Sequence, residues 1–233
     1  MKYSKIKTYL NIYKSYYYFG HTLIDRTAML AGFAKQLDYS AIGENYLSDM
    51  KNGGILLNAH IGNWEIAGML LQKLNKKVNL LMFEGELNKI KQYIESISTD
   101  KNYQIISISN DFSHLIKIEE ALKNKEIICM HGDRFIEGAS FQEIEFLGKK
   151  AKFPTGPHYL AIKYGVPISY TFTIKQEKYK YFFYATKPTL LVSINNPQKR
   201  KEKILDSMRF YVAELEKVVR QHPNQWFNFY DFW

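Results

Sequence analysis

The sequence predicts one α/β domain over residues 1–233, with a mostly parallel central sheet flanked by helices. Two observations lead to this prediction. Short apolar runs alternate with amphipathic segments from residue 53 to residue 186, and such alternation places a helix between neighbouring parallel strands. The 233 residues are also 46% hydrophobic and 15% aromatic, which is typical of a folded chain with a sizeable core.

Each element follows from its local pattern. Apolar runs bounded by turn residues predict strands at 53–59, 78–83, 103–108, 126–131, 141–147, 166–174 and 179–186. Apolar residues at helical spacing predict helices within 4–34, over 64–74, near 85–97, around 111–124, and over 155–164 and 197–221. The last two strands, which KQEK separates, are expected to form an antiparallel hairpin at one edge of the sheet.

Residues 1–40 form a basic, aromatic, amphipathic segment. Ile6, Tyr9, Leu10 and Tyr13 recur at helical spacing among lysines. Such a helix either lies in a membrane interface or docks its aromatic face on the core, and both interpretations stay open. No window reaches the ~20 apolar residues that a membrane-spanning helix needs, and no signal peptide is found. We therefore expect a soluble or peripheral protein with cytoplasmic exposure.

The net charge and the single cysteine limit the kinds of partner and of catalytic group to expect. The 32 Lys+Arg outnumber the 23 Asp+Glu, and the net charge of +9 favours an anionic partner. The basic residues are dispersed and no nucleic-acid-binding motif is found, so we do not expect a nucleic-acid partner. Cys129 lies in the apolar run EIICM and has no second cysteine to pair with, so we expect a buried, inert thiol.

The stretch NAHIGNWE (58–65) carries the first candidate site. His60 lies where a predicted strand ends, and functional groups gather at that edge of an α/β sheet. Asn63 is a good N-cap for the next helix, and Glu65 falls in its first turn. A histidine with a carboxylate suits a general base and its orienting partner, although a structural pair stays open. No metal is expected, because no third ligand stands at zinc-motif spacing.

NAHIGNWE resembles the HxxxxE/D block of the lysophospholipid acyltransferase superfamily, and more closely the first block of the bacterial lipid A biosynthesis acyltransferases. Three later stretches resemble further blocks of that family: CMHGDRF (129–135), FLGKKAKFPTGPHYLAIKYGVPI (146–168) and HPNQWFNFYDFW (222–233). The resemblance covers roughly residues 53–174 and the final stretch. One departure is MFEGELNK (82–89), where many members carry an Arg-Pro segment, and it leaves the acceptor open.

The resemblance implies a glycerolipid-acyltransferase-like fold and an acyltransferase. A fatty acyl group would pass from a thioester of acyl carrier protein or coenzyme A to a lipid or glycolipid hydroxyl. His60 would be the general base and Glu65 its orienter, with no cofactor beyond the acyl donor. We expect such a protein to work at the cytoplasmic face of the bacterial inner membrane, attached peripherally and without a transmembrane helix. A thioester hydrolase and a non-catalytic lipid- or carrier-binding protein stay open.

Four further residues are candidates for substrate binding, together with Asn63. Asp133 and Arg134 end a strand on the same side of the sheet as His60, where they bind a phosphate or form a structural ion pair. Thr155 is expected to cap the next helix. Gly156 lets the backbone approach a ligand, so that N–H groups there would stabilise an oxyanion, unless PTGP is an ordinary turn.

Overall fold

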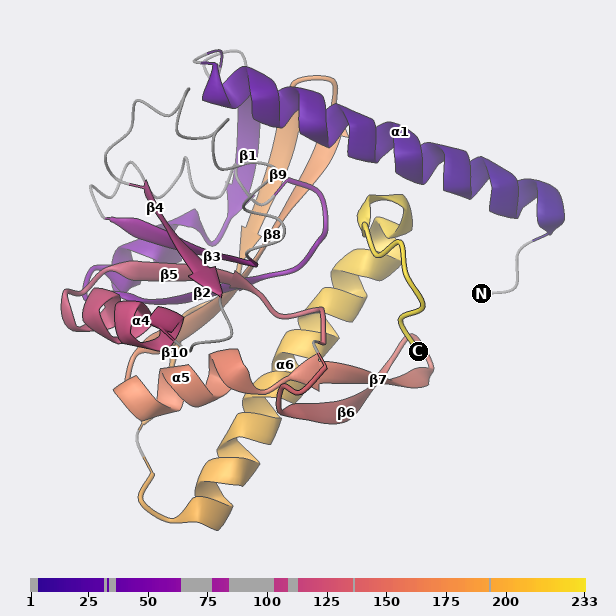
Figure 1. Cartoon of the computed structure of the whole chain (residues 1–233). Helices are drawn as coiled ribbons and strands as arrows, with labels where there is room; N and C mark the ends of the chain where they lie inside the picture. Colours follow the sequence, from indigo (N-terminus) through magenta and orange to yellow (C-terminus); the bar gives the residue numbers. More distant parts are fainter. Residues whose placement is uncertain are drawn as a thin grey trace.

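The computed structural model describes residues 4–31, 33, 37–63, 77–83, 103–108, 113–135, 137–192 and 194–233. In these residues, eight strands form the main sheet, in the order β1-β9-β8-β2-β5-β3-β4 with β10 beside β8 (Figure 1). The strands are β1 (Asp38–Ile42), β2 (Gly54–Asn58), β3 (Val78–Phe83), β4 (Tyr103–Ile108), β5 (Ile127–His131), β8 (Pro167–Glu177), β9 (Lys180–Ala185) and β10 (Thr189–Leu190). The helices predicted over 64–74 and near 85–97 lie outside the described residues.

The sheet is mostly parallel, as the sequence predicts. β8, β2, β5, β3 and β4 run parallel to their neighbours in that order, whereas β8 and β9 form the antiparallel hairpin. The hairpin is not at the edge, because β1 pairs in parallel outside β9. The sequence analysis missed β1, whose residues DYSAI are exposed or half-buried and carry no apolar run.

β2 lies in the middle of the sheet and is buried on both faces. Ile55 and Leu57 belong to one apolar cluster, and Leu56 belongs to the cluster on the other face. A strand covered on both faces reads as a continuous apolar run, which explains why GILLN is recognisable in the sequence.

Helices pack on this sheet and position its strand ends. They are α4 (Ser113–Lys123), which contacts β4 and β5, α5 (Gly156–Tyr164), which contacts β2 and β8, and α6 (Pro197–Gln221), which contacts α5 and β8. α6 begins where Asn196 accepts hydrogen bonds from the backbone N–H groups of Gln198 and Lys199. Two 3₁₀ helices, η2 (Glu44–Met50) and η3 (Pro223–Gln225), are also described.

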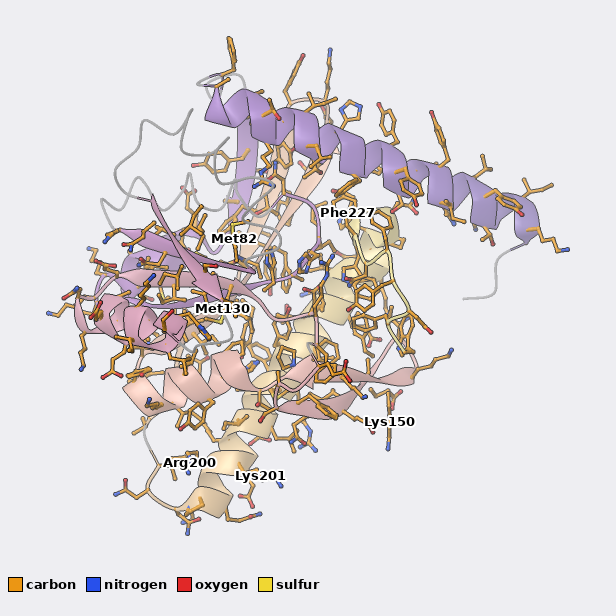
Figure 2. The ribbon with its side chains drawn as sticks, viewed as in Figure 1. Met82, Met130, Lys150, Arg200, Lys201 and Phe227 are labelled. Atoms are coloured by element: carbon orange, nitrogen blue, oxygen red, sulfur yellow. The ribbon has the colours of Figure 1, made fainter. Side chains whose placement is uncertain are left out.

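β6 (Phe141–Phe146) and β7 (Lys149–Pro154) form a separate two-stranded antiparallel sheet. Leu147 and Gly148 connect them with φ values of 53° and 85°, as a two-residue hairpin turn of the I′ kind requires. The predicted strand over 141–147 therefore exists, but it belongs to this hairpin and not to the parallel sheet. In Figure 2, Lys150 extends from the hairpin away from the body of the protein.

α1 (Lys5–Leu30) is one continuous helix, and its first half extends beyond the rest of the protein (Figure 1). The face toward the body mixes polar and aromatic residues: Asn11, Ser15, Phe19 and Thr22 are half-buried and Asp25 is buried. The opposite face is apolar and exposed, at 76% for Ile6, 72% for Tyr9, 69% for Tyr13 and 64% for Ile24. Surface helices of soluble proteins normally bury their apolar face, so α1 has the reverse orientation.

Two kinds of contact hold α1 in this orientation. Asp25 accepts hydrogen bonds from Lys175 and Tyr181 in a buried cluster beneath the helix. Phe19 packs edge-on against Phe227, with ring centroids 5.2 Å apart, and Figure 2 shows Phe227 just below α1. Of the helices that the structure describes, none is apolar over a length sufficient to cross a bilayer.

Candidate active site

His60 and Asp133 are brought together by the register of two neighbouring strands. Asn58, the last residue of β2, is the register partner of His131, the last residue of β5. His60 and Asp133 each follow two residues later, so they leave the same edge of the sheet side by side. This is the carboxyl edge of parallel strands, where α/β proteins place their functional groups.

Asp133 holds both the backbone and the ring of His60. Its Oδ2 accepts from the His60 backbone N–H at 3.0 Å, and its Oδ1 lies 2.7 Å from His60 Nδ1. The Asp133 side chain is fully buried, whereas that of His60 keeps 20% of its surface exposed. A buried carboxylate therefore fixes the ring, which still reaches solvent.

The protonation states follow from this contact. Burial acts to raise the pKa of Asp133, but the charge of His60 and the hydrogen bonds from His60 and Trp226 act against it, and the pKa falls well below its usual value. An ionised carboxylate can only accept, so His60 Nδ1 is the donor. Nε2 is then the nitrogen of the neutral ring that can accept a proton.

Residues 225–228 close over this pair. The Trp226 indole Nε1–H donates to Asp133 Oδ2 at 3.0 Å, and the Asn228 amide donates to the same oxygen at 3.3 Å. The Phe227 backbone N–H donates to the His60 carbonyl oxygen at 2.7 Å. Asp133 thus accepts from four donors, which is how a buried carboxylate is kept ionised.

Gly62 fits a position where another residue would collide. Its φ is 58°, and a Cβ there would lie 1.8 Å from the Thr173 carbonyl oxygen. The close approach lets the Asn63 N–H donate to that oxygen at 2.9 Å, while the Gly62 N–H donates to the Gln225 carbonyl oxygen at 2.9 Å. The glycine therefore joins the loop after β2 both to β8 and to residues 225–228.

Among the other predicted site residues, Asn63 is buried at 2% exposure, against β8. Thr155 occupies the N-cap position of α5, but its hydroxyl donates to the Ser140 carbonyl oxygen at 3.2 Å and makes no capping bond. Gly156 is exposed in the first turn of α5. Trp64 and Glu65 lie outside the described residues.

The structure places Asp133 and Arg134 in different surroundings, and their binding of substrate stays a prediction. The Asp133 carboxylate is buried and bonded to His60, Trp226 and Asn228. Arg134 donates from Nη2 to the Phe227 carbonyl oxygen at 3.0 Å and from Nε to the Asn228 side chain at 3.1 Å. Sequence analysis did not assign Trp226 or Asn228 to the site, because spacing does not show that a segment 93 or more residues away returns to Asp133.

A pocket of about 330 Å³ lies next to this segment. Its lining includes the rings of Phe135, Tyr230 and Trp233 and the side chains of Lys150 and Lys152. The Arg134 guanidinium carbon lies 5.7 Å from the centre of the Tyr230 ring. Arg134, which follows Asp133 in the chain, therefore contacts the wall of the pocket.

A reactive thiol and a metal centre are the two alternative kinds of catalytic site. Cys129 is buried and burial raises the pKa of its thiol to about 12, so the thiol is inert as the sequence predicts. Within the described ranges, no group of three or more His, Cys, Asp or Glu side chains is arranged to hold a metal ion.

Comparisons with known proteins identify the family of this chain. A family model described as bacterial lipid A biosynthesis acyltransferase matches residues 19–233. The chain belongs to this family. The motifs of the sequence also indicated the lipid A biosynthesis acyltransferase family, and membership supports acyl transfer as the reaction.

Individual relatives are distant. Phosphatidylinositol mannoside acyltransferases from two strains of Mycobacterium tuberculosis are 23% identical over 139 residues, which is 58% of this chain and 44% of theirs. The match thus spans less than half the length of these curated relatives. The crystal structure of the 1-acyl-sn-glycerophosphate acyltransferase PlsC from Thermotoga maritima is similar with a TM-score of 0.46 and 17% identity, over 91% of this chain and 97% of that one.

Proposed function

We propose that this member of the family transfers a fatty acyl group from a thioester of acyl carrier protein or coenzyme A to a hydroxyl of a lipid or glycolipid. One observation carries the proposal: the Nδ1–H of His60 is held by a buried, ionised carboxylate at 2.7 Å. That arrangement leaves Nε2 as a base on a partly exposed ring. Phosphatidylinositol mannoside is a glycolipid, and the name of the two mycobacterial relatives is consistent with such an acceptor.

The proposed reaction needs no covalent enzyme intermediate. His60 Nε2 takes the proton of the acceptor hydroxyl as its oxygen attacks the thioester carbonyl carbon. The tetrahedral intermediate collapses, the carbon–sulfur bond breaks, and the imidazolium returns its proton to the leaving thiolate. The products are the acylated lipid and the free thiol of the carrier. Stabilisation of the oxyanion by N–H groups near Gly156 stays a prediction.

We assign the orienting role to Asp133 and not to Glu65. The neutral imidazole has one Nδ1 proton, and Asp133 Oδ1 already accepts it. Asp133 also stabilises the imidazolium that forms during transfer, because the two groups then carry opposite charges at hydrogen-bond distance. Trp226 and Asn228 fix the carboxylate in turn.

The proposed site of action is an anionic membrane surface, and the orientation of α1 supports it. The exposed apolar face of α1 carries tyrosines, whose rings suit the interface between lipid headgroups and acyl chains. Lys5, Lys7 and Lys14 are exposed on the same helix, where they would meet anionic headgroups. A lipid acceptor would reach the enzyme from that surface.

A transfer assay tests the proposal. Wild-type protein and His60→Ala are incubated with labelled acyl thioesters of both carriers and a total lipid extract, and products are resolved by mass. We expect a new acylated lipid from the wild type and none from His60→Ala, while Asp206→Asn, at an exposed position of α6, behaves like the wild type. Free fatty acid without acylated lipid would identify a hydrolase. Carrier binding without either product, or full transfer by His60→Ala, would contradict the proposal.

A further inference from the structure

A second histidine ring lies against the proposed base. His131 ends β5, and its ring stacks on the ring of His60 with centroids 4.1 Å apart and planes 25° from parallel. Asp133 holds the edge of the His60 ring through Nδ1. The ring is thus restrained at its edge by a carboxylate and at its face by an imidazole.

The surroundings of His131 keep it neutral. Burial lowers the pKa of His131 well below its usual value, and the charges of His60 and Arg134 act in the same direction, against the opposing carboxylate of Asp133. Among the described residues, the charged groups that act on His131 include these three. His131 therefore remains an uncharged ring beside His60, whose Nδ1 contacts Asp133.

We propose that His131 is a positioning residue for His60, whose neutral ring fixes the plane of the base and stabilises the imidazolium that forms during transfer. The inference rests on the proposed role of His60 as general base. Rotation about the Cβ–Cγ bond of His60 would move Nε2 away from an acceptor hydroxyl, and a stacked ring opposes that rotation. The face of an aromatic ring also attracts a cation, most strongly where water is excluded.

The stacking predicts different effects for two replacements. His131→Phe keeps a flat ring, whereas His131→Leu removes it and keeps an apolar side chain. In His131→Leu we expect the titration midpoint of His60 to fall by about 0.4 to 1.5 pH units, because the free energy of a cation–aromatic contact corresponds to a shift of that size. The kcat of transfer should fall roughly tenfold or more with KM nearly unchanged, since a misplaced base affects chemistry and not binding.

The measurement is the pH titration of the His60 ring by NMR, assigned from the resonance that His60→Gln lacks, beside kcat and KM. Cys129→Ala, two residues earlier on the same face of β5, controls for disturbance of the strand. We expect His131→Phe and Cys129→Ala to titrate like the wild type and His131→Leu to shift. His131→Met replaces His131→Leu if the latter does not fold.

An unshifted His60 in the ring-free variant would overturn the proposal, and so would a shift of equal size in His131→Phe. The titration is independent of turnover. If the wild type transfers no acyl group, the proposed function fails while the stacking is still tested.

Discussion

The indole N–H of Trp226 donates to the carboxylate of Asp133 at 3.0 Å, and it thereby connects residues 225–228 to the proposed base. The same carboxylate oxygen accepts from the backbone of His60. The segment after α6 therefore covers the candidate active site and also holds the Asp133 carboxylate by hydrogen bonds.

Replacing Trp226 with phenylalanine should separate this hydrogen bond from packing. The Trp226 ring packs on Phe146 and Phe232, contacts that phenylalanine can partly preserve. A hydrogen bond to a charged group contributes about 1.5–3 kcal/mol, so we expect Trp226→Phe to lower kcat about tenfold or more. Rates of transfer measure the effect, with Trp233→Phe as the control at an exposed ring. Equal rates for Trp226→Phe and the wild type would show that Asp133 does not depend on the indole.

Asp133 should give the protein a defined acid sensitivity. Its folded-state pKa lies below the unfolded value of about 3.9. Its contribution to stability is therefore fully present above the unfolded pKa and is lost as pH falls through the folded pKa. We expect the difference in unfolding free energy between the wild type and Asp133→Asn to shrink as the pH falls below about pH 4.

Urea unfolding at each pH provides that measurement. Asp206→Asn is the control, because Asp206 is exposed at 69% and its ion pair with Arg209 lies in solvent. A difference between wild type and Asp133→Asn that grows as the pH falls below about pH 4 would have the wrong sign for a carboxylate with a lowered pKa.

The exposed face of α1 should bind anionic bilayers. Burying an isoleucine side chain contributes about 1.5–3 kcal/mol, so Ile24→Ser should weaken binding to phosphatidylglycerol vesicles roughly tenfold. Ile116→Ser is a matched control, because Ile116 on α4 is exposed at 63% and Ile24 at 64%. Co-sedimentation with phosphatidylglycerol and phosphatidylcholine vesicles measures both. Equal losses from the two variants would mean that α1 is not the binding face.

The buried ion pair of Lys175 and Asp25 beneath α1 should show a strong coupling in the free energy of unfolding. Lys175 and Asp25 are both nearly inaccessible, and the Lys175 ammonium also donates to the Lys178 carbonyl oxygen at 2.7 Å. Lys175→Met leaves a buried carboxylate without its cation, which typically costs about 3–5 kcal/mol. The double variant Asp25→Leu/Lys175→Met should recover most of that loss.

Unfolding free energies of both single variants and of the double variant complete the cycle. Lys178→Met, which changes only an exposed side chain, should unfold like the wild type. Losses that simply add in the double variant would show that the two side chains do not stabilise each other.

The sequence predicted the parts of the fold that its periodicity encodes. β2 and β5 are recognisable because both faces are buried, and α6 because its apolar residues repeat at helical spacing. β1 was missed because an exposed strand has no such run. His60 is recognisable as a candidate because a polar group directly after a buried strand is conspicuous, and its role stays a prediction.

The contact between His60 and Asp133 was not predicted, although both residues were placed on the same side of the sheet. Asp133 becomes the neighbour of His60 only through the register of β2 with β5, which the sequence does not state. Trp226 and Asn228 reach Asp133 only because α6 and η3 return the chain to the carboxyl edge of the sheet. The amphipathic pattern of α1 is visible in the sequence. The orientation of the helix, however, depends on the hydrogen bond from Lys175 to Asp25.

The most direct test of the account compares two carboxylates in the transfer assay, Asp133→Asn and Glu65→Gln. If Asp133 orients and stabilises His60, Asp133→Asn should lower kcat on the order of a thousandfold or more, because an amide neither fixes the tautomer nor balances the imidazolium charge. Glu65→Gln should retain more activity than Asp133→Asn. An Asp133→Asn enzyme within twofold of the wild type, beside an inactive Glu65→Gln enzyme, would contradict the assignment of Asp133.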